Sequence, residues 1–209
     1  MRDNVNDLLE EVTRLMNAYK SGRKLYSRLH DPDYLKNDFS KAVRFTVLNR
    51  ITFSGLIDSG GYSSQAFERG IPQAYISNLL KLSDLLKGVR ITNKNYESLL
   101  SEKGERVFIF MDPPYWKSKR ENARLYGKNG NLHRSFNHSR FAENVKRCKH
   151  KWLITYCDSM VIRELFKFAS KNISTWDMFY GMSNINNQKI NKVNELFISN
   201  YSPIVKIEK

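Results

Sequence analysis

The residues best suited to chemistry form one tetrapeptide, Asp112-Pro113-Pro114-Tyr115, which directly follows the apolar run 107–111. The two prolines fix φ and remove two backbone donors, so the turn is stiff and presents carbonyl oxygens. The Asp112 carboxylate and the Pro113 carbonyl could accept both N–H groups of an exocyclic amine, such as that of adenine. The Tyr115 ring could stack on a base taken out of a duplex. The tetrapeptide therefore predicts transfer to an amine, and an ordinary proline turn after a strand is the alternative.

The elements that must position this turn alternate between strands and helices from residue 88 onwards. The continuous apolar run 107–111 is typical of a strand buried on both faces, and open α/β sheets bind ligands where such strands end. Apolar patterns predict further strands over residues 89–92, 152–156, 173–180 and 195–200, and helices over 96–101, 139–148 and 160–169. This alternation predicts a mainly parallel α/β sheet flanked by helices. The direction of the last two strands stays open.

The first 87 residues have a mainly helical pattern. Apolar residues at helical spacing predict helices over residues 5–19, 40–51 and 71–87. The segment 20–41 is polar and basic, and its pattern fits a helix or an irregular segment. The stretch 54–64 is rich in glycine and serine, which indicates a loop or hairpin that can approach a ligand closely.

The balance of charge points to a polyanionic partner. The 209 residues carry a formal net charge of +14, which favours nucleic acid first and an anionic membrane surface second; a basic soluble protein is the plain alternative. No apolar run approaches the ~20 residues that span a bilayer, and the N-terminus lacks a signal-peptide core. The cysteines and histidines show no metal-ligand spacing. We expect a reduced, cytoplasmic protein without a metal site or a membrane partner.

The tetrapeptide resembles the catalytic motif of the Dam-like (D12 class) DNA adenine-N6 methyltransferases. Four other segments resemble that family in the same order along the chain, at residues 49–56, 125–138, 152–158 and 192–201. The first is similar to the family's "NR-x-x-F-N-G-L" segment, and the last to its closing "K-x-x-E-L-x-I-x-N-Y" strand. The resemblance spans almost the whole chain. It implies methyl transfer from S-adenosylmethionine to adenine N6 in double-stranded DNA, and restriction–modification is one setting that fits it.

The resemblance assigns roles to individual residues. The catalytic residues would be Asp112, Pro113, Pro114 and Tyr115, and Asn95, Tyr96 and Asp112 would contact the methyl donor. At the first two of these positions the family often has Asp-Phe, so Asn95-Tyr96 is a departure. Seven further residues would contact DNA: Arg50, Ser54, Gly55, Lys117, Lys119, Arg124 and Lys128. For the four basic residues among these that follow the tetrapeptide, a solvated loop is the alternative.

The expected fold is α/β, with a Rossmann-like methyltransferase sheet that is N-terminally incomplete and an inserted, mainly helical DNA-recognition region. Residues 1–19 and 88–209 would form the catalytic core, and residues 20–87 the recognition region. The family's first strand, its Phe-x-Gly-x-Gly loop and its ribose-binding acidic residue are not recognised in this sequence. We therefore expect weak donor binding by the chain alone and a partner polypeptide that supplies the missing strands.

Two other functions stay open beside DNA adenine methylation. The chain could be a non-catalytic DNA-binding remnant, or one half of a split methyltransferase, because the donor loop is missing. It could instead methylate RNA or a protein amide, since related tetrapeptides occur in such enzymes. The segment 49–56 and the basic residues after the tetrapeptide argue against that last class.

Overall fold

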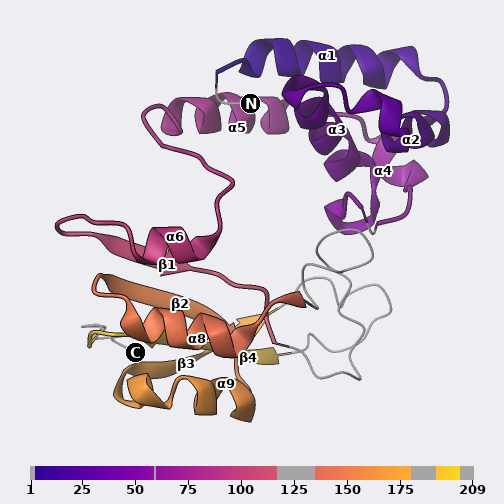
Figure 1. Cartoon of the computed structure of the whole chain (residues 1–209). Coiled ribbons are helices and arrows are strands. Elements are labelled where there is room, and N and C mark those ends of the chain that lie inside the picture. Colours follow the sequence, from indigo (N-terminus) through magenta and orange to yellow (C-terminus); the bar gives the residue numbers. More distant parts are fainter. Residues whose placement is uncertain (1–2, 59, 117–134, 180–191, 203–209) are drawn as a thin grey trace. The chain divides into compact units, whose positions relative to one another are not determined.

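The structure is a computed structural model in which residues 3–58, 60–116, 135–179 and 192–202 are described. These residues separate into a helical unit that extends to Ile91 and an α/β unit that begins at Thr92 (Figure 1). Each unit has a hydrophobic core of its own. The mixed α/β composition agrees with a methyltransferase fold.

The helical unit follows the pattern of its apolar residues. Its helices are α1 (Val5–Ala18), α2 (Gly22–His30), α3 (Asp38–Ile51), α4 (Ser64–Glu68) and α5 (Gln73–Leu85), with short 3-10 turns at Pro32–Tyr34 and Phe53–Gly55. The predicted helices at 5–19, 40–51 and 71–87 are therefore confirmed to within two residues at each end. Two reciprocal hydrogen bonds between Asn37 and Ser40 form a capping box at the start of α3, which satisfies backbone N–H groups that a helix start leaves without partners.

The core of this unit lies between α1, α2 and α3. Leu8, Val12 and Leu15 of α1 are buried together with residues of α2 and α3. Their spacing of three and four residues places them on one face of the helix. In the structure α1 thus packs in the same unit as residues 20–87. The functional assignment of residues 1–19 to a catalytic core stays a prediction.

The α/β unit contains four strands and three α-helices among its described residues. They are α6 (Tyr96–Leu100), β1 (Phe108–Met111), α8 (His138–Arg147), β2 (Lys151–Cys157), α9 (Met160–Leu165), β3 (Ile173–Phe179) and β4 (Lys192–Ser199), with a 3-10 segment at Lys167–Asn172. The strand predicted at 89–92 is wrong, because those residues are irregular and Val89 and Ile91 are exposed. An isolated apolar run forms a strand only where a neighbouring strand can pair with it.

The sheet has the order β1-β2-β4-β3. Strands β1 and β2 are parallel, with Phe108 opposite Lys151, whereas β4 is antiparallel to both β2 and β3. The prediction of a mainly parallel sheet is therefore wrong, and the sheet is mixed. The reason lies in the chain order: β4 follows β3 as its antiparallel neighbour and enters the sheet between β2 and β3.

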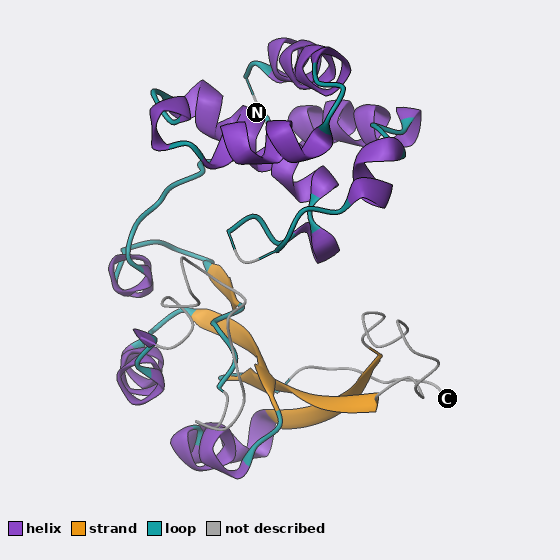
Figure 2. Cartoon of the chain, turned by 90° about the vertical axis from the view of Figure 1, so that its right-hand side faces the viewer, coloured by secondary structure: helices purple, strands orange, loops and turns teal. Residues whose placement is uncertain are grey.

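Helices cover one face of this sheet. In Figure 2, α6, α8 and α9 lie on the same side of the strands, and their apolar residues pack with Trp152, Ile154 and Tyr156 of β2. On the opposite face, Phe108 and Phe110 are 53% and 58% exposed. The prediction that the run 107–111 is buried on both faces is therefore wrong. The run forms an edge strand, and no described helix covers its second face.

No helix within the described ranges is both long and apolar enough to cross a bilayer.

Candidate active site

The tetrapeptide lies where the two parallel strands of the sheet end. Asp112 directly follows Met111, the last residue of β1, and Met111 is paired with Ile154 of β2. Because β1 and β2 run in the same direction, the turn after β1 lies beside the last residues of β2. The carboxyl ends of parallel strands are where open α/β sheets bind ligands. The position expected for the tetrapeptide is therefore the observed one.

The Asp112 carboxylate is held by the neighbouring strand. Thr155 of β2 donates a hydrogen bond of 2.8 Å from its Oγ1 to Oδ1 of Asp112. The pairing of the strands explains this contact. Phe110 of β1 lies opposite Leu153 of β2, and side chains two residues apart in a strand point to the same face. Asp112 and Thr155 therefore lie next to each other on that face. Asp112 remains exposed. One carboxylate oxygen has a protein donor, and the carboxylate is accessible to an incoming amine.

The Tyr115 side chain contacts the sheet through both its hydroxyl and its ring. Its hydroxyl donates a hydrogen bond of 3.1 Å to Oε2 of Glu195 in β4, and its ring lies 5.8 Å from the ring of Tyr156, with an interplanar angle of 31°. Burial raises the pKa of the Tyr115 phenol above its ordinary value, and the nearby charges of Glu195 and Asp112 act in the same direction. The phenol therefore stays protonated, and remains a donor, at neutral pH.

A second aromatic residue, Tyr156, supports the first. Its hydroxyl contacts Nδ1 of His138, the first residue of α8, and its ring packs on Phe141 and Phe166. The side chain is fully buried, and burial raises the pKa of its phenol. The Tyr115 ring therefore contacts a residue, Tyr156, whose own position is fixed by three neighbouring side chains.

The two candidate donor-binding residues, Asn95 and Tyr96, form the start of α6. The Asn95 side chain caps this helix by accepting a hydrogen bond from the Glu97 backbone N–H at 3.0 Å, which leaves its amide NH₂ group for an acceptor. The Tyr96 ring packs edge-on against Phe141 at 5.2 Å, and the Tyr96 hydroxyl donates to Oε1 of Glu97. Asn95 is exposed and Tyr96 half-buried.

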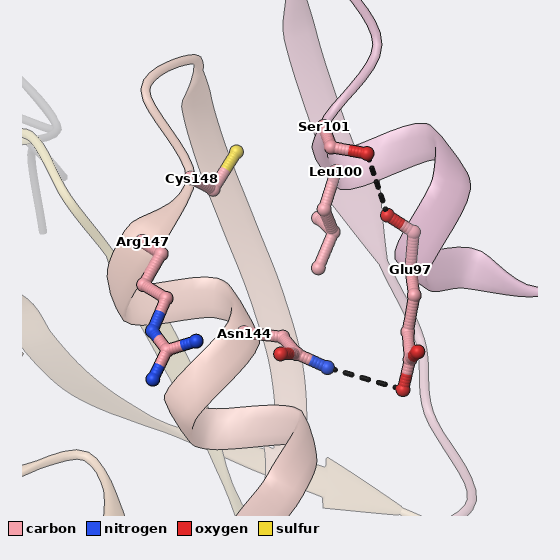
Figure 3. A pocket seen from close by; sticks show the side chains of 6 residues that line it. All are labelled: Glu97, Leu100, Ser101, Asn144, Arg147 and Cys148. Carbon is pink, nitrogen blue, oxygen red and sulfur yellow. Dashed lines mark hydrogen bonds between the residues drawn. The ribbon is translucent and has the colours of Figure 1, made fainter.

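A pocket of about 180 Å³ lies beside this helix, between α6 and α8 (Figure 3). Asn144 projects into it and donates a hydrogen bond to the Glu97 carboxylate. Its other lining residues are Leu100, Ser101, Arg147 and Cys148. None of the residues predicted to bind donor or DNA lines this pocket, so we assign it no part in the site.

Three predicted DNA-contacting residues lie in the helical unit, near the end of α3. The guanidinium of Arg50 lies over the Tyr75 ring, 5.1 Å from its centroid, and its buried Nε has no hydrogen-bond partner among the described residues. Ser54 and Gly55 both have positive φ, 55° and 67°, and an added Cβ at Gly55 would lie 2.8 Å from Nδ2 of Asn49. The glycine is required here by backbone conformation and by close packing.

The other four predicted DNA-contacting residues, Lys117, Lys119, Arg124 and Lys128, lie outside the described residues. Their positions stay a prediction from the sequence. Within the described ranges, no group of three or more His, Cys, Asp or Glu side chains could hold a metal ion.

Comparison with protein families matches residues 1–182 to the D12 class of N6 adenine-specific DNA methyltransferases. The match covers the helical unit and the α/β unit as far as residue 182, and includes the tetrapeptide and the strand that carries Thr155. The chain belongs to this family. A search of curated proteins gave no significant match. Membership in the D12 family indicates DNA adenine methylation, and methyltransferases of this family generally use S-adenosylmethionine.

In this member of the D12 family, two residues to which the sequence analysis assigned no role contact the tetrapeptide. Thr155 contacts Asp112, and Glu195 contacts Tyr115. A sequence signal existed for Thr155, because a polar residue near the end of an apolar strand beside a catalytic turn is a candidate partner. For Glu195 the signal was an acidic residue within the apolar strand 192–199, where a buried carboxylate requires a partner.

Proposed function

We propose that this chain transfers a methyl group from S-adenosylmethionine to N6 of adenine in duplex DNA. One observation carries the proposal: the Asp112 carboxylate is exposed at the carboxyl end of β1 and oriented by Thr155. The family match supplies the class of reaction.

The chemistry follows from the electronic structure of the amine. The lone pair of an exocyclic adenine amine is delocalised into the ring, so the nitrogen is a weak nucleophile. If its two N–H groups donate to the Asp112 carboxylate and the Pro113 carbonyl, the nitrogen can become tetrahedral and its lone pair becomes available. The N–CH₃ bond forms as the S–CH₃ bond of the donor breaks. The resulting aminium loses its proton to solvent, so no strong base is required, and positioning dominates the rate.

The base must leave the duplex before it can reach this turn. In this proposal the Tyr115 ring stacks on the extruded adenine, as aromatic side chains do in other base-flipping enzymes. Its hydrogen bond to Glu195 and its contact with Tyr156 support a fixed ring orientation before DNA arrives. Pro114 stiffens the backbone between the acceptors and the ring.

The residues proposed for the methyl donor are chemically suited to it. The amide NH₂ of Asn95 is not used by the helix cap and can donate to a ring nitrogen of the donor's adenine. Tyr96 offers an aromatic edge, and Asp112 carries the negative charge that an α-ammonium group prefers. When bound, S-adenosylmethionine supplies a methyl group activated by its sulfonium.

Double-stranded DNA is the proposed partner, and the net charge of +14 supports it. We assign its contacts to Arg50, Ser54 and Gly55 in a recognition region at residues 20–87, and to basic residues after the tetrapeptide. Residues 1–19 and 88–209 form the catalytic core in this proposal. The basic residues concerned are Lys117, Lys119, Arg124 and Lys128.

We also propose that a further polypeptide segment completes the donor site. Strand β1 is an edge strand, and its second face carries the exposed rings of Phe108 and Phe110. An apolar edge of this kind is a surface on which another strand can pair. The glycine-rich donor loop that the family resemblance predicts would follow such a strand.

A methylation assay tests the proposed function. The full chain, alone and with a polypeptide that carries the glycine loop, is incubated with tritiated S-adenosylmethionine and either unmethylated duplex DNA, RNA or protein. We expect label in N6-methyladenine of the DNA arm only. Label in RNA or protein would replace the proposal by one of those substrate classes. DNA binding without label in any arm would favour a non-catalytic DNA-binding protein.

Calorimetric titration with S-adenosylmethionine separates the donor site from the reaction. We expect weak or undetectable binding by the chain alone and micromolar binding with the added segment. Micromolar binding by the chain alone would contradict the proposal of a completing segment, while leaving the methylation proposal intact.

A further inference from the structure

A carboxylate is buried in the sheet directly behind the tetrapeptide. Glu195 of β4 is 3% exposed and lies opposite Cys157 of β2 and Trp176 of β3. Removing a carboxylate from water is costly unless hydrogen bonds replace the lost solvation. Two side-chain donors reach the same oxygen, Oε2: the Tyr115 hydroxyl at 3.1 Å and the Trp176 indole Nε1 at 3.4 Å. An apolar residue would fill this strand position without that cost, which makes a role in the site the better explanation.

The tyrosine hydroxyl also calls for an explanation. Stacking on a base requires only an aromatic face, which phenylalanine would supply equally well. The hydroxyl of Tyr115 instead reaches across the turn to a residue 80 positions later in the chain. The bond to Glu195 fixes the direction of the Tyr115 side chain, and the contact with the Tyr156 ring restricts rotation of the Tyr115 ring. Because the hydroxyl lies on the axis about which the ring rotates, the two contacts act together to orient the ring.

We propose that Glu195 is a positioning residue that acts through the Tyr115 hydroxyl to orient the ring against the extruded base. The inference rests on the proposed DNA adenine methylation and deepens it. Glu195 contacts neither substrate nor donor in this proposal. Its loss should lower kcat, because the base is misplaced at the turn, and should change KM for DNA little, because phosphate contacts determine encounter with the duplex.

The test is a double-mutant cycle in the full chain. The polypeptide that carries the glycine loop is added if the chain alone does not bind S-adenosylmethionine. Tyr115→Phe and Glu195→Leu should each lower kcat on unmethylated duplex DNA by about 10-fold to 100-fold, the range expected for a hydrogen bond to a charged group. In the Tyr115→Phe background, Glu195→Leu should cost less than about 3-fold further, since coupled residues are not additive. Glu195→Gln keeps an acceptor and should retain most of the activity. If Glu195→Leu fails to fold, Tyr115→Phe and Glu195→Gln still test the prediction.

Trp176→Phe is the matched control, because it removes a different donor to the same oxygen. We expect kcat within about 2-fold of the wild type. Additive losses in the cycle, or a loss in Trp176→Phe equal to that in Glu195→Leu, would overturn the positioning role. Urea unfolding of the same variants measures how much the Tyr115–Glu195 hydrogen bond contributes to the free energy of unfolding, independently of catalysis. A wild-type chain that does not methylate DNA would overturn the proposed function and the positioning role together, whereas additive losses in an active enzyme overturn only the latter.

Discussion

Thr155 of β2 holds the carboxylate of Asp112 through a hydrogen bond of 2.8 Å. The two residues are 43 positions apart in the chain and are brought together by the parallel pairing of β1 and β2. A carboxylate attached at one oxygen has less rotational freedom than a free one, so less ordering remains to be done when the amine arrives.

Replacing Thr155 by valine should therefore weaken catalysis more than stability. Valine keeps the β-branched shape and removes the donor, and we expect kcat/KM to fall by about 10-fold, at the lower end of the range for a hydrogen bond to a charged group. Thr155→Ser keeps the hydroxyl and should stay within about 3-fold of the wild type. Methylation kinetics on duplex DNA provide the measurement. Equal activity of the valine and serine variants would show that the bond is not used.

Asp112→Ala should remove methyl transfer while leaving DNA binding largely intact. The carboxylate is exposed and in the proposed reaction contacts the reacting amine, so kcat should fall by about 100-fold or more. Asp84→Ala removes an exposed carboxylate that pairs with Lys87 in the helical unit, and should leave kcat unchanged. Wild-type turnover in the Asp112 variant would exclude this turn as the catalytic site.

DNA binding should depend steeply on salt. If the chain neutralises about three phosphates, raising the salt from 50 to 200 mM lowers the affinity about 40-fold through counterion release. Fluorescence anisotropy with a labelled duplex measures this slope. Arg50→Gln should reduce the slope by about one phosphate contact. An affinity that does not change with salt would reject the basic residues as a DNA-binding surface.

Gly55→Ala should destabilise the loop after α3. Gly55 has φ of 67°, and a new Cβ would lie 2.8 Å from Nδ2 of Asn49, so we expect strain of about 1–2 kcal/mol plus the cost of moving Asn49. Gly70→Ala is the control, because Gly70 has φ of 60° but no atom within 4 Å of the new Cβ. Thermal unfolding should show a larger loss for Gly55→Ala. Equal losses would mean that Asn49 moves away without cost.

The free energy of unfolding should fall above about pH 10. Burial raises the pKa of Tyr115 and Tyr156 in the folded chain, whereas unfolded tyrosines ionise near pH 10. Below that pH both states are protonated and stability is complete. Above it the unfolded state releases protons first, so stability declines as pH rises towards the folded pKa. Urea unfolding at pH 8 and pH 11 measures this, and Tyr156→Phe should show a smaller decline. An equal decline would assign the effect to other groups.

The sequence predicted the helices well, because their apolar residues recur with a clear period. In α1, Leu8, Val12 and Leu15 are buried on one face, which is the pattern that the segment 5–19 displays. It predicted the position of Asp112 because the two prolines that follow Asp112 lack a backbone N–H for a strand ladder, which favours the end of the strand at this point.

Pairing between distant strands could not be predicted in this way. The run 107–111 has the composition of a central strand, yet β1 lies at the edge and Phe110 is 58% exposed. Trp176 likewise lies in a segment of strand-forming composition, yet it is 42% exposed. Its indole is used to donate to Glu195. Composition indicates that a segment is a strand, but neighbours are determined by register and chain order, which a local pattern does not contain.

The strand order has a consequence for how the protein is made. Strand β4, which follows the other three described strands in the chain, lies inside the sheet between β2 and β3, and its residues Leu196 and Ile198 are fully buried. Until β4 is synthesised, β3 lacks the neighbour with which it pairs and Tyr115 lacks Glu195. The described residues of the helical unit all lie before residue 92, so this part of the chain can fold earlier during translation. The turn at Asp112–Tyr115 therefore lacks its contact with Glu195 until β4 has been synthesised, so a nascent chain that carries only the helical unit does not yet have the assembled candidate site.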